Sequence, residues 1–305
     1  MNKIKFQNGV FIATQDEKQL FLELLQKSLL SNNEEEHRLI ADTILQPIER
    51  VAAYQEWLSG VLQPVQRDLS TTVKVAVDVP TAIGFSTSPT GQPFYTRPGR
   101  RYADIAMEAF DVGLQIGWFD PQVFGWNVVE KKIREAGEEL ARKRDAIRKA
   151  ALDAAISAVP GHAATVAGSM TKASVDAIFA SAASIGRNIV RVRINPKRLM
   201  DMTNWSWSSS NSLWQYNSPE RNEEILRNGY VTNYGGALWE PFVGAPLNTV
   251  YFFTEPQYVG YEARVTGFPK SWTDSKLDTK SDYYVWMDFL GVYCVGNAVW
   301  SLTIL

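Results

Sequence analysis

The feature that most constrains the fold of this chain is a long amphipathic segment between residues 122 and 159. Apolar side chains recur through it at helical spacing, and they share one face: Val129, Ile133, Ala136, Leu140, Ile147, Ala151, Ala154 and Ala158. Asp120 and Pro121 supply a cap and a first-turn signal, and Pro160 with Gly161 ends the pattern. A helix of this extent would be roughly 50 Å long. We expect the other elements to be arranged around this single rod.

A basic stretch, RKRDAIRK, interrupts the apolar face of this helix near Lys143 and Arg144. It has two interpretations. One is a solvated helix face, supported by opposite charges at helical spacing such as Glu138 with Arg142. The other is a contact with nucleic acid through its basic side chains: Arg142, Lys143, Arg144 and Arg148.

The chain before the helix divides into two parts. Residues 1–72 predict an outlying arm of short helices, which Pro47 and Pro64 should interrupt because proline lacks an amide donor. A strand should follow, since β-branched residues alternate with other residues at Val73, Val75, Val77 and Val79. The turn sequence SPTGQP and a second short strand complete an extended hairpin. A two-stranded ribbon is marginal alone, so we expect this hairpin to lie against another surface.

After the helix the pattern is a mixture of helices and strands. Residues 188–196 predict a strand, and a helix that begins with a proline follows it. The last 25 or so residues are rich in β-formers and end on an apolar strand, so we expect the C-terminus to lie within a sheet.

The sequence carries none of the common catalytic fingerprints. It has two histidines and one cysteine, which cannot form a zinc site at a standard spacing. The patterns GxxxxGK[ST], GxGxxG and GxSxG are absent. The acidic run at residues 34–36 suits a helix start, His162 lies in a turn, and Cys294 lies between apolar neighbours. We therefore expect no cofactor, no metal and no common enzyme chemistry.

Charge and hydropathy bound the environment. The net charge of −2 gives no general attraction to polyanions, and no apolar run approaches the roughly 20 residues that cross a bilayer. The first residues lack the apolar core of a secretory signal. We expect synthesis in a reducing compartment and no membrane contact.

The order of the expected elements resembles the Hong Kong 97-type major capsid protein of tailed bacteriophages, from about residue 30 to 305. Three local stretches carry the resemblance: RRYADIAMEAFDVGLQIGWFDPQVF before the long helix, NIVRVRINPKRLMDM, and the stretch that begins PERNEEILRNGYVTNYGGALWEPF. The resemblance implies an α+β fold with five parts. They are an N-terminal arm (1–72), an extended E-loop hairpin (73–102), a peripheral domain with the long spine helix (103–174), an axial domain (175–275), and C-terminal strands that return to the peripheral domain (276–305).

The resemblance also implies where subunits touch, because this family's hairpin and axial domain contact neighbouring copies. The implied contact residues are aromatic and arginine side chains, which are favoured at interfaces: Phe85, Phe94, Tyr95, Arg97, Arg100, Arg101, Tyr234 and Trp239. Tyr234 and Trp239 would be core as well as contact residues, and Gly235 and Gly236 would form a close-approach turn.

The function implied by the resemblance is structural. Many copies would form pentamers and hexamers of an icosahedral virion shell around double-stranded DNA, after synthesis in the cytoplasm of a host bacterium. Portal, separate scaffolding and decoration proteins would be partners, and Arg142, Lys143, Arg144 and Arg148 would face the DNA without reading its sequence. Some family members crosslink a hairpin lysine to a neighbour. Residues 75–130 contain no lysine, so we expect non-covalent assembly.

Three alternatives remain at this point. An encapsulin-like nanocompartment would share the fold and enclose cargo enzymes. A soluble carbohydrate- or peptide-binding module could use the aromatic-rich stretch at residues 225–242. An enzyme that uses Asp and Glu side chains without a recognised motif is the third.

Overall fold

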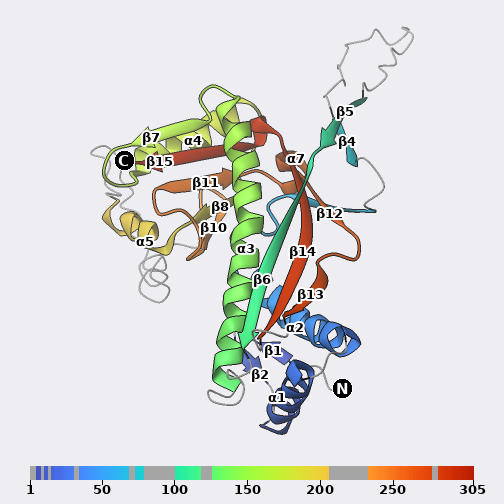
Figure 1. The fold of residues 1–305 in the computed structure, drawn as a ribbon. Helices are drawn as coiled ribbons and strands as arrows, with labels where there is room; N and C mark the ends of the chain where they lie inside the picture. Colours follow the sequence, from blue (N-terminus) through green and yellow to red (C-terminus); the bar gives the residue numbers. More distant parts are fainter. Residues whose placement is uncertain are drawn as a thin grey trace, which may run out of the picture.

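The computed structural model describes residues 5–7, 10–12, 15–30, 34–68, 73–78, 100–117, 126–205, 233–276 and 281–305. One 32-residue helix, α3 (Trp126–Ser157), runs along the molecule, with one β-sheet beside it and a second sheet toward its C-terminal end (Figure 1). The prediction of a single long rod is therefore confirmed.

The buried face of α3 follows the predicted stripe only in its first half. Val129, Ile133, Ala136 and Leu140 are buried, as predicted. The second half buries a different set: Arg144, Asp145, Arg148, Leu152 and Ile156. The residues predicted there are half-buried (Ile147 and Ala151) or exposed (Ala154 and Ala158). The prediction was wrong here because alanine suits either face of a helix, whereas the charged residues are paired and can be buried.

The sheet beside α3, here called the peripheral sheet after the domain expected there, is built on the long strand β14 (Ser281–Cys294). One edge of β14 pairs antiparallel with β6 (Met107–Gly117) over the full length of β6. The other edge pairs first with β13 (Lys270–Lys276) and then with β12 (Gly260–Val265). The strand β3 (Gln63–Arg67) adds in parallel to β12. Alternate residues of these strands face α3, and they bury Val112, Leu114, Ile116, Tyr284 and Trp286.

Two N-terminal helices complete this body, so the described part of the arm is not outlying. The helices α1 (Gln15–Leu30) and α2 (Glu34–Gln55) contribute buried side chains to the core that α3 and the sheet share. Pro47 was expected to end a helix, but α2 continues through it. The apolar side chains of α2 are buried in the core that this helix shares with α3 and the sheet, and that burial offsets the cost of the missing hydrogen bond. A small pair of strands, β1 (Lys5–Gln7) and β2 (Val10–Ile12), precedes α1.

The second sheet, here called the axial sheet after the domain expected to contain most of it, has six strands in the order β7, β15, β11, β8, β10 and β9. Their bounds are Ala163–Val166, Val299–Ile304, Thr249–Phe253, Arg191–Ile194, Ala237–Pro241 and Asn233–Tyr234. The helix α4 (Lys172–Ser184) packs on this sheet, and α5 (Pro196–Leu199) with η2 (Met200–Asn204) follows β8. The short helices α7 (Pro256–Val259) and η4 (Gly296–Ala298) lie in the crossings between the two sheets.

The C-terminal strand lies inside this sheet, between β11 and β7, as the apolar ending predicts. The sheets nevertheless divide the chain differently from the expected domain ranges. The strands β7 and β15 belong to the axial sheet although they lie outside 175–275. The strands β12 and β13 belong to the peripheral sheet although they lie inside that range, except for Lys276. Local patterns do not determine which sheet a strand joins, because that depends on pairing between distant segments.

The hairpin expected between residues 73 and 102 is described only at its base. There β4 (Val73–Asp78) pairs antiparallel with β5 (Arg100–Ile105), from Val73 opposite Ile105 to Asp78 opposite Arg100. This ribbon projects from the end of β6 (Figure 1). The expected contact residues Phe85, Phe94, Tyr95 and Arg97 lie outside the described residues.

Candidate functional site

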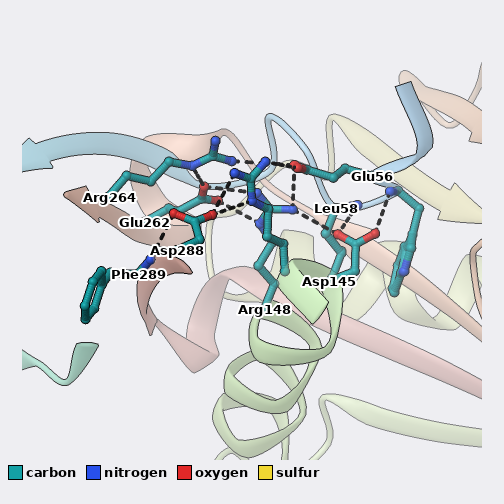
Figure 2. A network of polar contacts seen from close by, with 10 residues as sticks. Glu56, Leu58, Asp145, Arg148, Glu262, Arg264, Asp288 and Phe289 are labelled. Atoms are coloured by element: carbon teal, nitrogen blue, oxygen red, sulfur yellow. Dashed lines mark hydrogen bonds and ion pairs between the residues drawn. The ribbon is translucent and has the colours of Figure 1, made fainter. Parts of the chain in front are cut away.

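The most distinctive polar feature of the molecule is a buried ion-pair cluster, made of Glu56, Arg144, Asp145, Arg148, Glu262, Arg264 and Asp288 (Figure 2). It forms where the second half of α3 meets the end of α2 and the strands β12 and β14. All of its members except Arg264 are buried. Four carboxylates therefore face three guanidinium groups in a largely dry environment.

Arg148 is at the centre of the ion-pair cluster and is 0% exposed. Its Nε and Nη2 donate to the two oxygens of Glu262, at 2.8 and 3.0 Å. Its Nη1 donates to Asp145 Oδ1 at 2.9 Å and lies 2.8 Å from Glu56 Oε2. A guanidinium group suits this position because its planar donors can satisfy several carboxylates at once.

Arg144 makes a second set of contacts one helical turn earlier. Its Nε and Nη2 donate to Asp288 Oδ2 at 2.8 and 2.7 Å, and its Nη1 donates to Glu56 Oε1 at 2.9 Å. Arg264 closes the cluster from β12, with its Nε 2.6 Å from Glu262 Oε1. Both oxygens of Glu56 are thus engaged by arginines from α3.

The titration behaviour of the cluster follows from burial and pairing. Burial acts to raise the pKa of Glu56 and of Glu262, but the neighbouring arginines outweigh it, so both pKa values lie below the ordinary range of Glu. For Asp145 burial dominates and raises the pKa to about 6, although Arg148 and the backbone amide of Trp57 favour the ionised form. Among these three carboxylates, Asp145 is therefore the one whose burial the neighbouring arginines do not outweigh.

The turn after α2 connects this cluster with the axial sheet. The backbone amides of Trp57 and Leu58 donate to Asp145, at 2.9 and 3.3 Å. On the opposite side, Arg193 Nη2 donates to the carbonyl of Ser59 at 2.9 Å, and Arg191 Nη1 donates to that of Gly60 at 3.0 Å. The short segment at residues 57–60 therefore contacts both α3 and the axial sheet.

The structure divides the four residues that we expected to face DNA. Arg142 and Lys143 are exposed, and Arg142 forms an exposed ion pair with Glu139. Arg144 and Arg148 are buried and bound to carboxylates, so the expectation that they face DNA was wrong. The sequence held a usable signal, because residues 144 and 148 continue the four-residue spacing of Leu140 and lead to Leu152.

Tyr234 and Trp239, which we expected to be both core and subunit-contact residues, lie in the core around the six-stranded sheet. Trp239 is 1% exposed and Tyr234 is 9% exposed, and both pack against Trp205. Tyr234 also donates its hydroxyl hydrogen to Asp176. The core part of the expectation is confirmed, because β9 and β10 alternate and place both rings on the covered side of the sheet. The burial of the two rings argues against a direct contact with a neighbouring subunit.

The remaining expected residues lie in a turn and in a strand. Gly235 and Gly236 form the turn between β9 and β10 with φ of +64° and +82°, and a Cβ on Gly235 would lie 2.8 Å from the Phe179 ring. The turn is therefore confirmed, with a close approach at Gly235, whereas a Cβ on Gly236 would meet nothing within 4 Å. Arg100 and Arg101 belong to β5, where they pair with Asp78 and Val77 through the backbone.

The described residues offer little that suggests catalysis. His162 is buried, stacks on Trp300 and has its Nδ1 2.9 Å from the carbonyl of Val299, so its role is in packing. Burial raises the pKa of Cys294 to about 12, which keeps the thiol unreactive. Among the residues that the structure describes, no cluster of His, Cys, Asp and Glu has the arrangement of a metal site. No helix in that part of the chain is both long and apolar enough to span a bilayer.

Solved structures with a similar fold include two capsids and an encapsulin. The capsid of the cyanophage P-SCSP1u is 11% identical with a TM-score of 0.57, over 81% of this chain and 88% of that one. The capsid of a native GTA particle is 12% identical with a TM-score of 0.59, over 83% and 90%. The SrpI encapsulin from Synechococcus elongatus is 12% identical with a TM-score of 0.51, over 81% and 86%.

Sequence comparison adds no relative. Neither the known protein families nor the curated proteins gave a match to this sequence. The structural likenesses show that the chain has the Hong Kong 97-type capsid fold, with helices and strands in an α+β arrangement around a spine helix.

Proposed function

We propose that this chain is the major capsid protein of a tailed bacteriophage. Its copies form pentamers and hexamers of an icosahedral virion shell around double-stranded DNA, and its role is structural and not enzymatic. The observation that supports this most is the fold, since the likeness to the capsid proteins of a cyanophage and of a GTA particle extends over at least four fifths of both chains. Portal, scaffolding and decoration proteins are its proposed partners, and the host cytoplasm is its site of synthesis.

The projecting ribbon of β4 and β5 supports assembly. Among the described strands, these two pair only with each other. A ribbon of this kind gains little stability alone, whereas a neighbouring copy would supply a covering surface. Arg100 and Arg101 in β5, together with Phe85, Phe94, Tyr95 and Arg97, remain the proposed contacts.

Contact with DNA is assigned to the exposed residues of the basic stretch. Arg142 and Lys143 lie on the solvent side of α3 and can approach phosphates, and such contacts are independent of base sequence and sensitive to salt. Glu138 and Glu139 on the same helix limit the positive charge. We therefore expect the contact with DNA to be weak and independent of the base sequence.

An encapsulin-like shell is the second candidate, because the SrpI encapsulin shares the fold at a TM-score of 0.51. An aromatic binding module is disfavoured, since Trp205, Tyr234 and Trp239 are buried among one another. Particle contents separate the two shells. Nuclease-protected DNA inside particles from infected or producing cells supports the capsid, and a single packaged enzyme supports the encapsulin.

The assembly contacts can be tested by substitution. The triple variant Phe85→Ser, Phe94→Ser and Tyr95→Ser should keep the far-ultraviolet circular dichroism of the parent and fail to form closed particles. The matched control carries Ser substitutions at the exposed Leu20 and Leu39 of α1 and α2. If the hairpin variant assembles as well as the control does, the proposed contacts are wrong.

A further inference from the structure

A groove with a volume of about 610 Å³ runs along the middle of α3, here called the spine groove. Its wall is formed by Gln55 and Trp57 together with the loop between β10 and β11, because a Cβ on Gly244 of that loop would lie 3.6 Å from the Trp57 ring. Its other side is a single face of α3, made of Glu138, Ala141, Arg142, Asp145, Ala146 and Lys149.

The α3 side of the spine groove is complementary to itself when a second copy is turned end to end. A twofold axis that crosses the helix between positions 143 and 144 exchanges the residues of this face in pairs. Two pairs then join opposite charges, and the pair between them joins two small side chains. The pairs are Glu138 with Lys149, Ala141 with Ala146, and Arg142 with Asp145.

The basic side chains of this face are available to a second copy. In a single copy Lys149 lies 2.5 Å from Asp153, and Arg142 lies 2.6 Å from Glu139. Both are contacts between largely solvated groups on one helix, which contribute little to stability. A carboxylate of a second copy can therefore share or replace either contact at small cost.

The acidic partner of Arg142 in this arrangement is Asp145. The backbone amides of Trp57 and Leu58 donate to its carboxylate, and so does Arg148. Burial nevertheless raises the pKa of Asp145 to about 6, so its negative charge is not fully compensated within one copy. Because Asp145 lines the spine groove, the guanidinium group of Arg142 from a second copy can approach it there.

The apolar residues of the spine groove suit a close helix contact. Ala141 and Ala146 lie at the centre of the face, and small side chains allow two helix axes to approach to roughly 8 Å. Val243 stands at the rim with 84% of its surface exposed. A second copy would cover this valine and remove its apolar surface from water.

We propose that two copies of the chain pair through their spine grooves, with the two α3 helices antiparallel across a twofold axis. The inference deepens the proposed function and rests on it, because an icosahedral shell has twofold axes at which a surface meets its own copy. The contact is small, so it should be weak between free copies and stronger where many contacts act together. The second copy then holds Arg142, and Lys143 remains exposed toward DNA.

The first test uses a carbodiimide, which joins a carboxylate to an amine only when the two groups touch. Within one copy Glu138 and Lys149 are 11 residues apart on one helix. This spacing corresponds to roughly 16 Å, which a direct amide cannot span. An amide between these two side chains must therefore join two copies. Mass spectrometry of the digested full-length chain should detect it in dimers and in shells.

The second test reverses the charges. Chains with Glu138→Lys would place lysines opposite each other, and chains with Lys149→Glu would place glutamates opposite each other. A mixture of the two variants restores opposite charges and should pair about tenfold more tightly than either variant alone. Sedimentation velocity measures the pairing. The control Lys131→Glu removes an exposed ion pair with Glu135 outside the spine groove and should pair as the unaltered chain does.

The inference is overturned if the Glu138–Lys149 crosslink is missing from dimers and shells, or if the two charge variants show no preference for each other. Mixed pairing also requires both variants to be folded, so it separates a lost contact from a misfolded chain. If circular dichroism shows that a variant is unfolded, Glu138→Gln and Lys149→Gln take their place, and each should weaken pairing.

Failure of this inference is distinguishable from failure of the proposed function. Shells that form without the Glu138–Lys149 crosslink would overturn the spine-groove contact alone. Crosslinked pairs that never build shells, even with scaffolding protein present, would contradict the shell function and leave the contact between two copies in place.

Discussion

Gly137 of α3 and Val51 of α2 meet at a contact with no room for a larger side chain at position 137. A Cβ built on Gly137 would lie 2.6 Å from the Cβ of Val51 and 3.0 Å from the carbonyl oxygen of Ile48. Because one of these neighbours is backbone and the other is a branched carbon, neither can move aside cheaply. The glycine therefore sets the distance between the arm and the spine helix, and any larger residue must separate them.

The first prediction follows from that contact. Gly137→Ala should lower the free energy of unfolding by about 1–3 kcal/mol, because overpacking a helix crossing forces the backbone to shift. Gly113→Ala in β6 is the control, since nothing lies within 4 Å of a Cβ there. Urea denaturation of both variants measures the difference. Equal stabilities would contradict the tight crossing.

The second prediction concerns the centre of the ion-pair cluster. Arg148→Met should destabilise the fold by about 3–5 kcal/mol, because it leaves buried carboxylates uncompensated. Arg142→Met removes an exposed pair on the same helix and should change stability by less than about 1 kcal/mol. Denaturation midpoints test this. If Arg148→Met is as stable as Arg142→Met, the cluster does not hold the fold together.

The third prediction concerns pH. The folded chain raises the pKa of Asp145 from 3.8 to about 6, so the native state binds this proton more tightly than the unfolded state does. Stability from this group is present at low pH and is lost as pH rises from about 4 to 6. Glu49, whose pKa burial also raises, acts in the same direction. Glu56 and Glu262 act oppositely, but only below the ordinary Glu range, near pH 4.5.

The wild-type free energy of unfolding at pH 5 should therefore exceed that of Asp145→Asn by about 1 kcal/mol more than it does at pH 7. Other titrating groups are common to both chains, so the difference between the two pH profiles isolates Asp145. Denaturation at intervals of half a pH unit provides the profiles. Parallel profiles would show that Asp145 does not titrate in this range.

The fourth prediction concerns covalent crosslinking. No lysine occurs between residues 75 and 130, so assembled particles should dissociate into single chains in hot detergent. A denaturing gel of purified particles should show one band of monomer size. A ladder of covalent multimers would contradict the expectation.

Local patterns were enough to predict the elements with strong periodicity. The spine helix, the alternation that pairs β4 with β5, and the burial of the C-terminal strand all follow from short-range spacing. Two adjacent glycines were likewise enough to identify the turn between β9 and β10. These features depend on residues a few positions apart, and backbone geometry alone determines them.

The features that the sequence did not reveal depend on distant partners. The local pattern indicates that Arg148 faces solvent or DNA. Only the fold places Glu262, 114 positions away, beside it. The local pattern predicts that Pro47 interrupts a helix, but the burial of α2 in the shared core keeps the helix continuous through it. The contact role expected for Tyr234 and Trp239 depends on the side of the sheet that they face, and the local pattern does not determine that side. In each case tertiary packing outweighs a local preference.

The measurement that tests the central claim most directly is the mass and shape of the purified chain, by multi-angle light scattering followed by electron microscopy. The proposed function predicts rings or closed particles of megadalton mass, either from the chain alone or after addition of its scaffolding protein. A chain that stays monomeric at high concentration and with scaffolding protein present would contradict the shell function. In that case the chain would share the fold of capsid proteins without their assembly into a shell.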